Sequence, residues 1–278
     1  MKKYILLVVV LIIAGGVYLF MASFESIVER LVHKYGSEVT QTSVDISGLK
    51  VKLSDGKASI NHITVANPKG YKTPYIFVLD GITVQINLKS LTTDTIIIES
   101  VDVLKPVVTY EMTALNKNNI DDILNNVNSY TARKAKETPK PDAKKEDEPS
   151  KKVIIKKLVI SQGELDAVAN LNVADLKVPL ANNKASVKLP QIVLTDIGQS
   201  KGGNDIGETI SQVITQMLAT ASQTVMTADF GDMQSLVQGN IKSATDTVNA
   251  GAKAAISGVT DTASDVGSKL KDTVNMFK

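Results

Sequence analysis

The sequence has no cysteine and no tryptophan among its 278 residues, and its two histidines are His33 and His62. The lack of thiols excludes disulfides, thiolate zinc sites and cysteine nucleophiles, and two histidines cannot build a multi-histidine metal centre. Aromatic residues make up only 4% of the chain, and 31 basic against 29 acidic residues give a net charge of +2. Such a balance creates no basic field for nucleic acid, so we expect no nucleic-acid partner.

The sequence also lacks a recognisable catalytic constellation. Nucleophilic catalysis needs a base beside a nucleophile, but His33 falls in a helical pattern and His62 in a strand pattern, and neither belongs to a motif. The neighbouring carboxylates Asp121 and Asp122 are explained by the preference of acidic side chains for the start of a helix. We therefore predict that the protein is not an enzyme and uses no cofactor.

One long apolar run is present, at the amino terminus. Residues 4–22 contain no charged side chain and follow Lys2 and Lys3. As a helix this run is about 28 Å long, close to the hydrocarbon thickness of a bilayer. We predict a transmembrane anchor over residues 1–22 that crosses the membrane once, with the amino terminus cytoplasmic and residues 23–278 on the other side, which is the periplasm in a Gram-negative cell. A cleaved signal peptide is the alternative, and it exports the same residues.

Periodicity divides the exported part of the chain. Residues 23–40 have apolar side chains at helical spacing and predict a membrane-proximal helix. From residue 41 the period changes to two, which predicts a β domain over residues 41–200, with Pro106 ending one run of strands. Residues 131–152 are rich in charge and proline and have no large apolar side chain, so we expect a disordered insert there.

Helical patterns accompany the strands. Asn119 is a candidate cap for a helix whose apolar stripe is Ile120, Ile123, Leu124 and Val127. A helical tail is predicted over residues 201–278. Its first helix is marked by Ile206, Ile210, Val213, Met217 and Ala221. An eleven-residue apolar period follows, which keeps one stripe aligned along a nearly straight helix. Five lysines against eight acidic residues over 204–278 argue against anionic lipid as the partner of this tail.

The predicted strands are one-sided, with Val, Ile and Leu on one face and polar residues on the other. That apolar face must be covered, either by the chain's own helices in an ordinary core or by acyl chains in an open trough. The predicted fold is α+β, with an amino-terminal transmembrane helix, a curved antiparallel β-sheet groove and long carboxy-terminal amphipathic helices. The residues predicted to line a lipid groove are Val51, Leu53, Ile60, Ile63, Val84, Ile86 and Leu88.

Three segments of the chain resemble the AsmA-like envelope proteins. They are SGLKVKLSDGKASI with ITVANPKG (47–60 and 63–70), IIIESVDVLKPVVTYE (96–111) and IKKLVISQGEL (155–165). The resemblance covers roughly residues 1–197, including the amino-terminal anchor. It implies an inner-membrane-anchored periplasmic protein with a groove-forming β domain, in a family linked to outer-membrane biogenesis and to the movement of phospholipid between membranes. Members thought to bridge two membranes have many more strands, whereas helical sequence begins here near residue 204. A small groove module, or a regulatory or structural envelope component, is therefore implied instead of a complete bridge.

Two functions are compatible with the sequence. The first is a periplasmic envelope protein that binds phospholipid in an apolar β-groove and contributes to outer-membrane biogenesis or lipid homeostasis. The second is a structural or stress-related interaction protein, whose helical tail mediates self-association or binds an envelope partner. The two differ in whether the apolar face of the sheet is covered by lipid or by protein.

Overall fold

The computed structural model describes residues 25–114, 117–136, 151–170, 184–199 and 202–230. A helix occupies residues 25–40. The other elements are β1 (Val44–Ser47), β2 (Lys50–Lys52), η1 (Leu53–Asp55), β3 (Lys57–Ala66), β4 (Tyr75–Ile86), η2 (Leu88–Thr92), β5 (Thr95–Ala114), β6 (Lys117–Asn118), α2 (Asn119–Lys136), β7 (Lys152–Ser161), β8 (Glu164–Ala169), β9 (Lys184–Lys188), β10 (Ile192–Ile197) and α3 (Ile206–Thr227), where η marks a short 3₁₀ helix.

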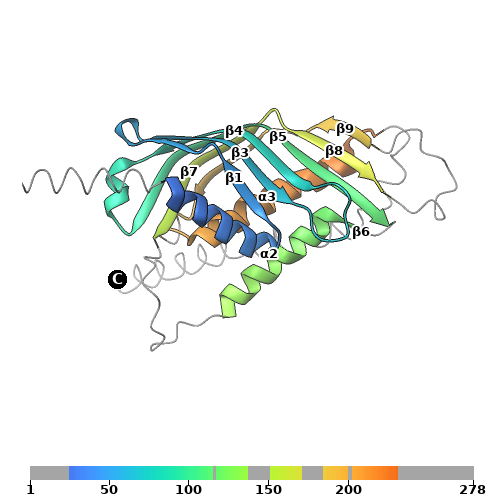
Figure 1. The fold of residues 1–278 in the computed structure, drawn as a ribbon, viewed down its shortest axis with the longest axis horizontal. Coiled ribbons are helices and arrows are strands. Elements are labelled where there is room, and N and C mark those ends of the chain that lie inside the picture. The colour runs from blue at the N-terminus through green and yellow to red at the C-terminus, as the bar shows by residue number, and fades with distance from the viewer. Residues whose placement is uncertain (1–24, 115–116, 137–150, 171–183, 200–201, 231–278) are drawn as a thin grey trace, which may run out of the picture.

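The described strands form one curved, ten-stranded sheet, and helix 25–40, α2 and α3 lie on the same side of it (Figure 1). The strand order is β1-β3-β4-β5-β7-β10, with β2 beside β3 and β6 beside β5. β8 lies beside the second half of β5, and β9 lies beside β8. The predicted α+β class is confirmed. The sheet is mixed rather than antiparallel, because β5 pairs in parallel with both β7 and β8.

The parallel pairs follow from the helix that separates the strands. Parallel neighbours need a crossover connection of about a dozen residues or more, which is usually helical. The chain between β5 and β7 contains the 18 residues of α2. The prediction of an antiparallel sheet was therefore wrong. A helix was predicted between β5 and β7, and such a helical connection allows the two strands to pair in parallel.

A bend crosses the middle of the sheet. Gly81 in β4 and Lys105 in β5 have positive φ angles of 63° and 54°, and the register between the two strands shifts beside them. The buried positions of β5 change there from odd numbers, as at Val103, to even numbers, as at Val108. Pro106 has no N–H for the ladder and is tolerated at such an irregularity. β5 therefore runs through Pro106, where we predicted that the strand would end.

The core lies between the sheet and the helices. The predicted stripe of α2 is confirmed, since Ile120, Ile123, Leu124 and Val127 are each at most 2% exposed. In α3 the predicted stripe is confirmed at Met217 and Ala221, which are 5% and 0% exposed, whereas Ile206, Ile210 and Val213 are half-buried against the core. Leu218 and Val225 are fully buried as well and were not predicted. Because α3 and Phe230 belong to the same core as the strands, the sheet domain extends beyond the predicted boundary at residue 200.

The predicted disordered insert at 131–152 was wrong at both ends. α2 continues to Lys136 and β7 begins at Lys152. The last turn of α2 consists of Ala, Arg and Lys, which are good helix formers and suit the negative end of the helix dipole. Residues 137–150 lie outside the described residues.

Helix 25–40 agrees with the predicted membrane-proximal helix. The predicted transmembrane anchor over residues 1–22 and the eleven-residue repeat after Phe230 lie outside the described residues, and both stay predictions. Within the described ranges, no helix has the length and apolar character that crossing a membrane requires.

Candidate functional site

Four of the residues predicted to line a groove come together on one face of β2, β3 and β4. The strand register places Val51 opposite Ala58 and Ala58 opposite Val84. Ile60 and Ile86 lie two residues further along their strands, so they share that face. We call Val51, Ile60, Val84 and Ile86 the aliphatic patch.

The aliphatic patch is only partly covered. Ile60 is 9% exposed, whereas Val51, Val84 and Ile86 are half-buried and pack against the edge of the core. On the other face of the same strands, Ser59 is exposed. The patch is thus an extension of the core whose apolar area is not fully removed from water by the described residues.

The remaining three predicted residues do not belong to the patch. Ile63 pairs with Ile46 and Leu79 further along the sheet, and these three half-buried residues also pack against the core. Leu88 is the first residue of η2 and is 39% exposed. The side chain of Leu53 lies outside the described part of the structure.

A hollow of about 500 Å³ between α3 and the β9–β10 connection was not predicted. Its volume lies within the usual range of small-molecule sites. The lining consists of Lys188, Leu189, Pro190, Thr220, Gln223, Thr224, Thr227 and Ala228.

The hydroxyls of the three threonines in this hollow are already bonded within α3. Thr220, Thr224 and Thr227 each donate to the backbone carbonyl four residues earlier, at 2.8 to 2.9 Å. Their methyl groups therefore remain as lining, and the wall is less polar than its composition suggests. The sequence signal for this face is the spacing of threonine at i, i+4 and i+7.

A buried carboxylate lies at one end of the sheet, which we call the loop end and define by residues 67–74 and β6. Glu111 is fully buried and accepts hydrogen bonds from the amides of Lys72 and Thr73 at 2.7 and 2.8 Å. The Thr73 hydroxyl and Asn170 Nδ2 also donate to it. Burial raises the pKa of Glu111, but these hydrogen bonds together lower it further, and the net pKa is below its ordinary value.

The first turn of α2 is tied into the same polar cluster. The Asp121 amide donates to Asn118 Oδ1 at 2.9 Å, so Asn118 caps the helix in place of the predicted Asn119. The fully buried Asn119 instead accepts from the Glu111 amide and donates to Asn67 Oδ1, both at 2.8 Å. The cluster fastens a loop and a helix to β5, which is a structural role.

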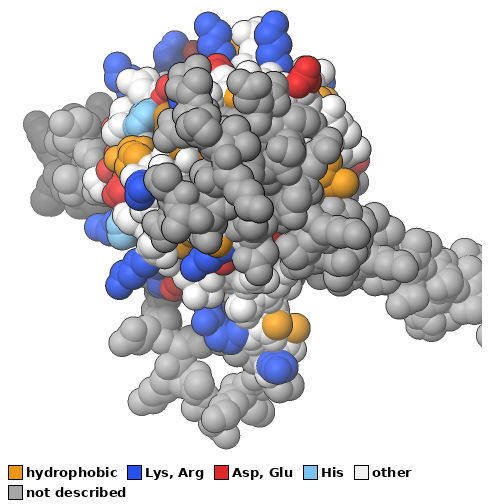
Figure 2. Space-filling view, turned by 90° about the vertical axis from the view of Figure 1, so that its right-hand side faces the viewer, with side chains coloured by type: hydrophobic (Ala, Val, Ile, Leu, Met, Phe, Trp, Pro, Cys, Tyr) orange, Lys and Arg blue, Asp and Glu red, His pale blue; other side chains and the backbone are white. Residues whose placement is uncertain are grey.

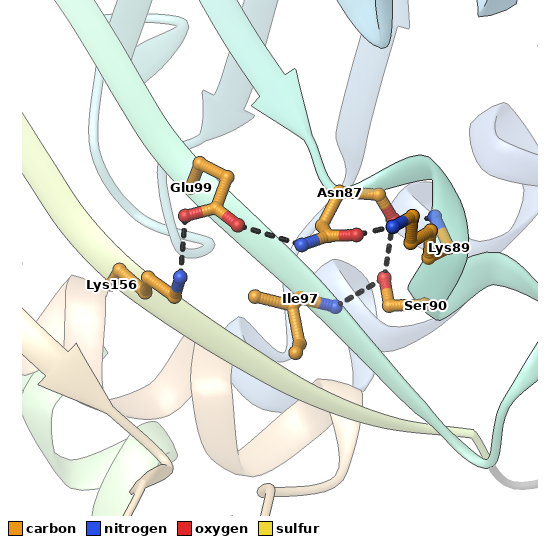
Figure 3. Close-up of polar contacts among 6 residues, drawn as sticks. All are labelled: Asn87, Lys89, Ser90, Ile97, Glu99 and Lys156. Carbon is orange, nitrogen blue, oxygen red and sulfur yellow. Dashed lines mark hydrogen bonds and ion pairs between the residues drawn. The ribbon is translucent and has the colours of Figure 1, made fainter.

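The opposite end of the sheet, which we call the η end, carries η1 and η2. Figure 3 shows how η2 is attached to two strands. Asn87 accepts from the Lys89 amide at 3.2 Å and donates to Glu99 at 2.9 Å, and Glu99 forms an ion pair with Lys156 at 2.7 Å. The hydrogen bonds from Lys156 and Asn87 lower the pKa of Glu99 below its ordinary value. The Ser90 hydroxyl accepts from a β5 amide at 2.9 Å.

The histidines lie on exposed or half-exposed surfaces. His33 is exposed on helix 25–40. His62 Nδ1 lies 2.5 Å from Asp80 Oδ1 across β3 and β4, and both side chains are about half exposed. Within the described ranges, no group of three or more His, Asp or Glu side chains is arranged to hold a metal ion.

The end of the molecule near β8 and β9 has a mixed surface. In Figure 2 the described hydrophobic side chains that face the viewer form small, separate groups between polar and charged ones. No protein-family model, no curated protein and no solved structure matches the chain. Among the described residues, the aliphatic patch is the strongest candidate site.

Proposed function

We propose that the protein is anchored in the inner membrane and binds phospholipid acyl chains on the aliphatic patch of a periplasmic domain. In line with the AsmA-like resemblance, it contributes to outer-membrane biogenesis or lipid homeostasis. The observation that carries this proposal is the patch itself: four predicted residues gather on one face, and three of them are half-buried. Each methylene of an acyl chain buried there gains about 0.8 kcal/mol.

The position of the patch supports the proposal. The amide of Val51 donates to Glu25 Oε1 at 3.0 Å, so the patch lies beside the start of helix 25–40. Glu25 is three residues beyond the segment for which we predict the membrane anchor. An acyl chain leaving the bilayer would therefore meet the patch before any other part of the sheet.

Replacing Val84 by glutamate is expected to abolish lipid binding, because a charged side chain on the patch cannot be desolvated against a hydrocarbon chain without a partner. The measurement is mass spectrometry of lipids extracted from the full-length protein after purification in mild detergent. We expect phospholipid with the wild type and a loss of at least about tenfold with Val84→Glu, which corresponds to about 1.4 kcal/mol of binding free energy.

Val193→Glu is the matched control, since it makes the same replacement on β10, where Val193 is 50% exposed and outside the patch. The lipid content of this variant should equal that of the wild type. Wild-type protein without bound phospholipid, or equal losses in the two variants, would contradict acyl-chain binding on the patch.

A second candidate is a structural interaction protein, and one observation favours it. Helix 25–40, α2 and α3 all lie on one side of the sheet, and side chains from α2 and α3 fill the core beneath it (Figure 1). In that case protein alone covers the apolar face, and the predicted tail after Phe230 serves self-association or an envelope partner. Wild-type protein that copurifies no phospholipid is the result that selects this function.

A further inference from the structure

We propose that the η end of the sheet docks onto anionic phospholipid headgroups at the surface of the inner membrane. This inference rests on the proposed membrane anchor and names the surface through which the periplasmic domain meets the bilayer. The docking surface comprises five exposed side chains from β2, β3 and η2: Lys50, Lys52, Lys57, Leu88 and Lys89.

The docking surface lies on the end of the sheet that is nearest to the predicted anchor. Helix 25–40 begins at the η end of the sheet, where Glu25 accepts a hydrogen bond from Val51 of β2 (Figure 1). Glu25 is three residues beyond the apolar run at 4–22. If the chain leaves the bilayer after residue 22, only residues 23 and 24 separate the anchor from Glu25. This short connection holds the η end close to the membrane surface.

Hydrogen bonds hold the segments of the docking surface in fixed positions. Gln85 Nε2 donates to the carbonyls of Asp55 and Gly56, both at 3.1 Å, and the Ile86 amide donates to Gly56 at 2.7 Å. These bonds join the turn after η1 to the end of β4, directly before η2. The contacts in Figure 3 then fix η2 to β5 and β7. The backbone around Leu88 is therefore held in place, and a small loop movement cannot bury the Leu88 side chain.

The docking surface is positively charged. The docking surface carries four lysines, and the acidic side chains beside it are Asp55, Asp94 and Glu25, so positive charge is still in excess. Glu99 also lies close by, but its charge is offset by Lys156. Asp55 forms an ion pair with Lys52 at 2.5 Å and so offsets that one lysine. Lysines next to an anionic membrane strengthen attachment by about fivefold each.

A further cation belongs to the same frame. Lys151 Nζ donates to the carbonyls of Leu91 and Thr93 at 2.6 and 3.0 Å, which places another positive charge at the end of η2. An exposed leucine on the same end of the sheet as several lysines is typical of surfaces that lie in the headgroup region of a bilayer, where the apolar side chain inserts and the ammonium groups contact phosphate. Charge and exposed apolar area thus both select an anionic lipid surface as the partner.

The absence of cysteine makes a direct test practical, because a single introduced cysteine is the only labelling site. Thr92→Cys places a fluorophore in η2, and Lys69→Cys places one at the loop end; both positions are exposed. The full-length protein is reconstituted into vesicles of phosphatidylcholine and phosphatidylglycerol in equal parts, with a quencher carried on a lipid. We expect quenching several-fold stronger at position 92 than at position 69, and weaker quenching at 92 in pure phosphatidylcholine.

The charge requirement is tested with the label at position 92. K50Q/K57Q/K89Q should shift the equilibrium away from the docked state by about fivefold for each lysine removed. The matched variant K69Q/K72Q/K117Q removes three exposed lysines from the loop end and should leave the quenching unchanged.

Equal quenching at positions 92 and 69, or quenching at 92 that depends neither on anionic lipid nor on the three lysines, would overturn the docking proposal. Flotation of the vesicles separates this failure from failure of the proposed function. A chain that does not float with vesicles overturns the anchor and the docking together. Quenching at 92 in a protein that copurifies no phospholipid supports docking and overturns acyl-chain binding.

Discussion

Replacing Glu111 by alanine should lower the free energy of unfolding by about 3 kcal/mol, measured by urea denaturation. The carboxylate is fully buried and accepts from the amides of Lys72 and Thr73, the Thr73 hydroxyl and Asn170. Each buried donor that loses its acceptor costs about 1 to 3 kcal/mol, and partial hydration of the loop limits the sum. Loop 67–74 should also become more susceptible to proteolysis, because Glu111 fastens it to β5.

Glu99→Ala is the matched control for this prediction, since it removes a carboxylate from the same strand. Glu99 is partly exposed and contacts Lys156 and Asn87 at the surface, so its loss should have a much smaller effect. A Glu111→Ala variant as stable as Glu99→Ala would show that the polar cluster at the loop end does not hold the fold together.

The contribution of Glu111 should also depend on pH. Burial raises its pKa, but the hydrogen bonds from Thr73, Lys72 and Asn170 leave the net pKa below the ordinary value. Stability from such a group is complete above the ordinary carboxyl pKa and is lost as the pH falls through the lowered folded-state pKa. The stability difference between the wild type and Glu111→Gln should therefore shrink on acidification, and a constant difference would contradict the assignment.

The second large effect is expected from Gly207→Ala at the start of α3. A Cβ atom at this position would lie 1.8 Å from Tyr130 Oη and 2.7 Å from Cζ, far inside van der Waals contact. Tyr130 is 1% exposed, so its ring cannot swing into solvent. Helix propensity alone predicts that alanine stabilises by about 1 kcal/mol, whereas overpacking costs about 1 to 3 kcal/mol or more. We expect a net loss of about 2 kcal/mol in thermal or urea denaturation.

Tyr130→Phe provides the matched test, because the Tyr130 hydroxyl has no hydrogen-bond partner within the described residues. The single variant should change stability little, and combining it with Gly207→Ala should recover part of the loss because the nearest clashing atom is gone. A coupling of at least about 0.5 kcal/mol is expected for residues in contact. If Gly207→Ala stabilises the protein, or if the two changes are strictly additive, the close approach of α2 and α3 is wrong.

The contrast between the two helices shows what periodicity can predict. The stripe at Ile120, Ile123, Leu124 and Val127 was correct because large aliphatic residues at helical spacing have no other face to turn inward. In α3 the buried set includes Gly207, Ser211 and Thr224, where small side chains permit close contact and hydroxyls bond to the helix's own backbone. A hydrophobicity pattern assigns such residues to the solvent face, which explains why these buried positions and the hollow were not predicted.

The face on which a residue lies could be predicted within a single strand, but the pairing between strands could not. Val51, Val84 and Ile86 were assigned to one face because period-two alternation holds within each short segment. Ile63 is three residues from Ile60 and still packs against the core, because the buried positions of β3 change from even numbers, as at Ile60, to odd numbers, as at Val65. The parallel pairing of β5 and the backbone conformation of Lys105 depend on contacts distant in sequence, which no local pattern contains.

The proposed function requires that phospholipid acyl chains occupy the aliphatic patch in the living cell. Photocrosslinking in intact cells tests this most directly. A diazirine-bearing amino acid replaces Val84 in one strain and Val193 in another, and irradiated protein is analysed by mass spectrometry. The account predicts a phospholipid-sized adduct at position 84 and none at position 193. Unmodified protein at position 84, or adducts of equal yield at both positions, would contradict it.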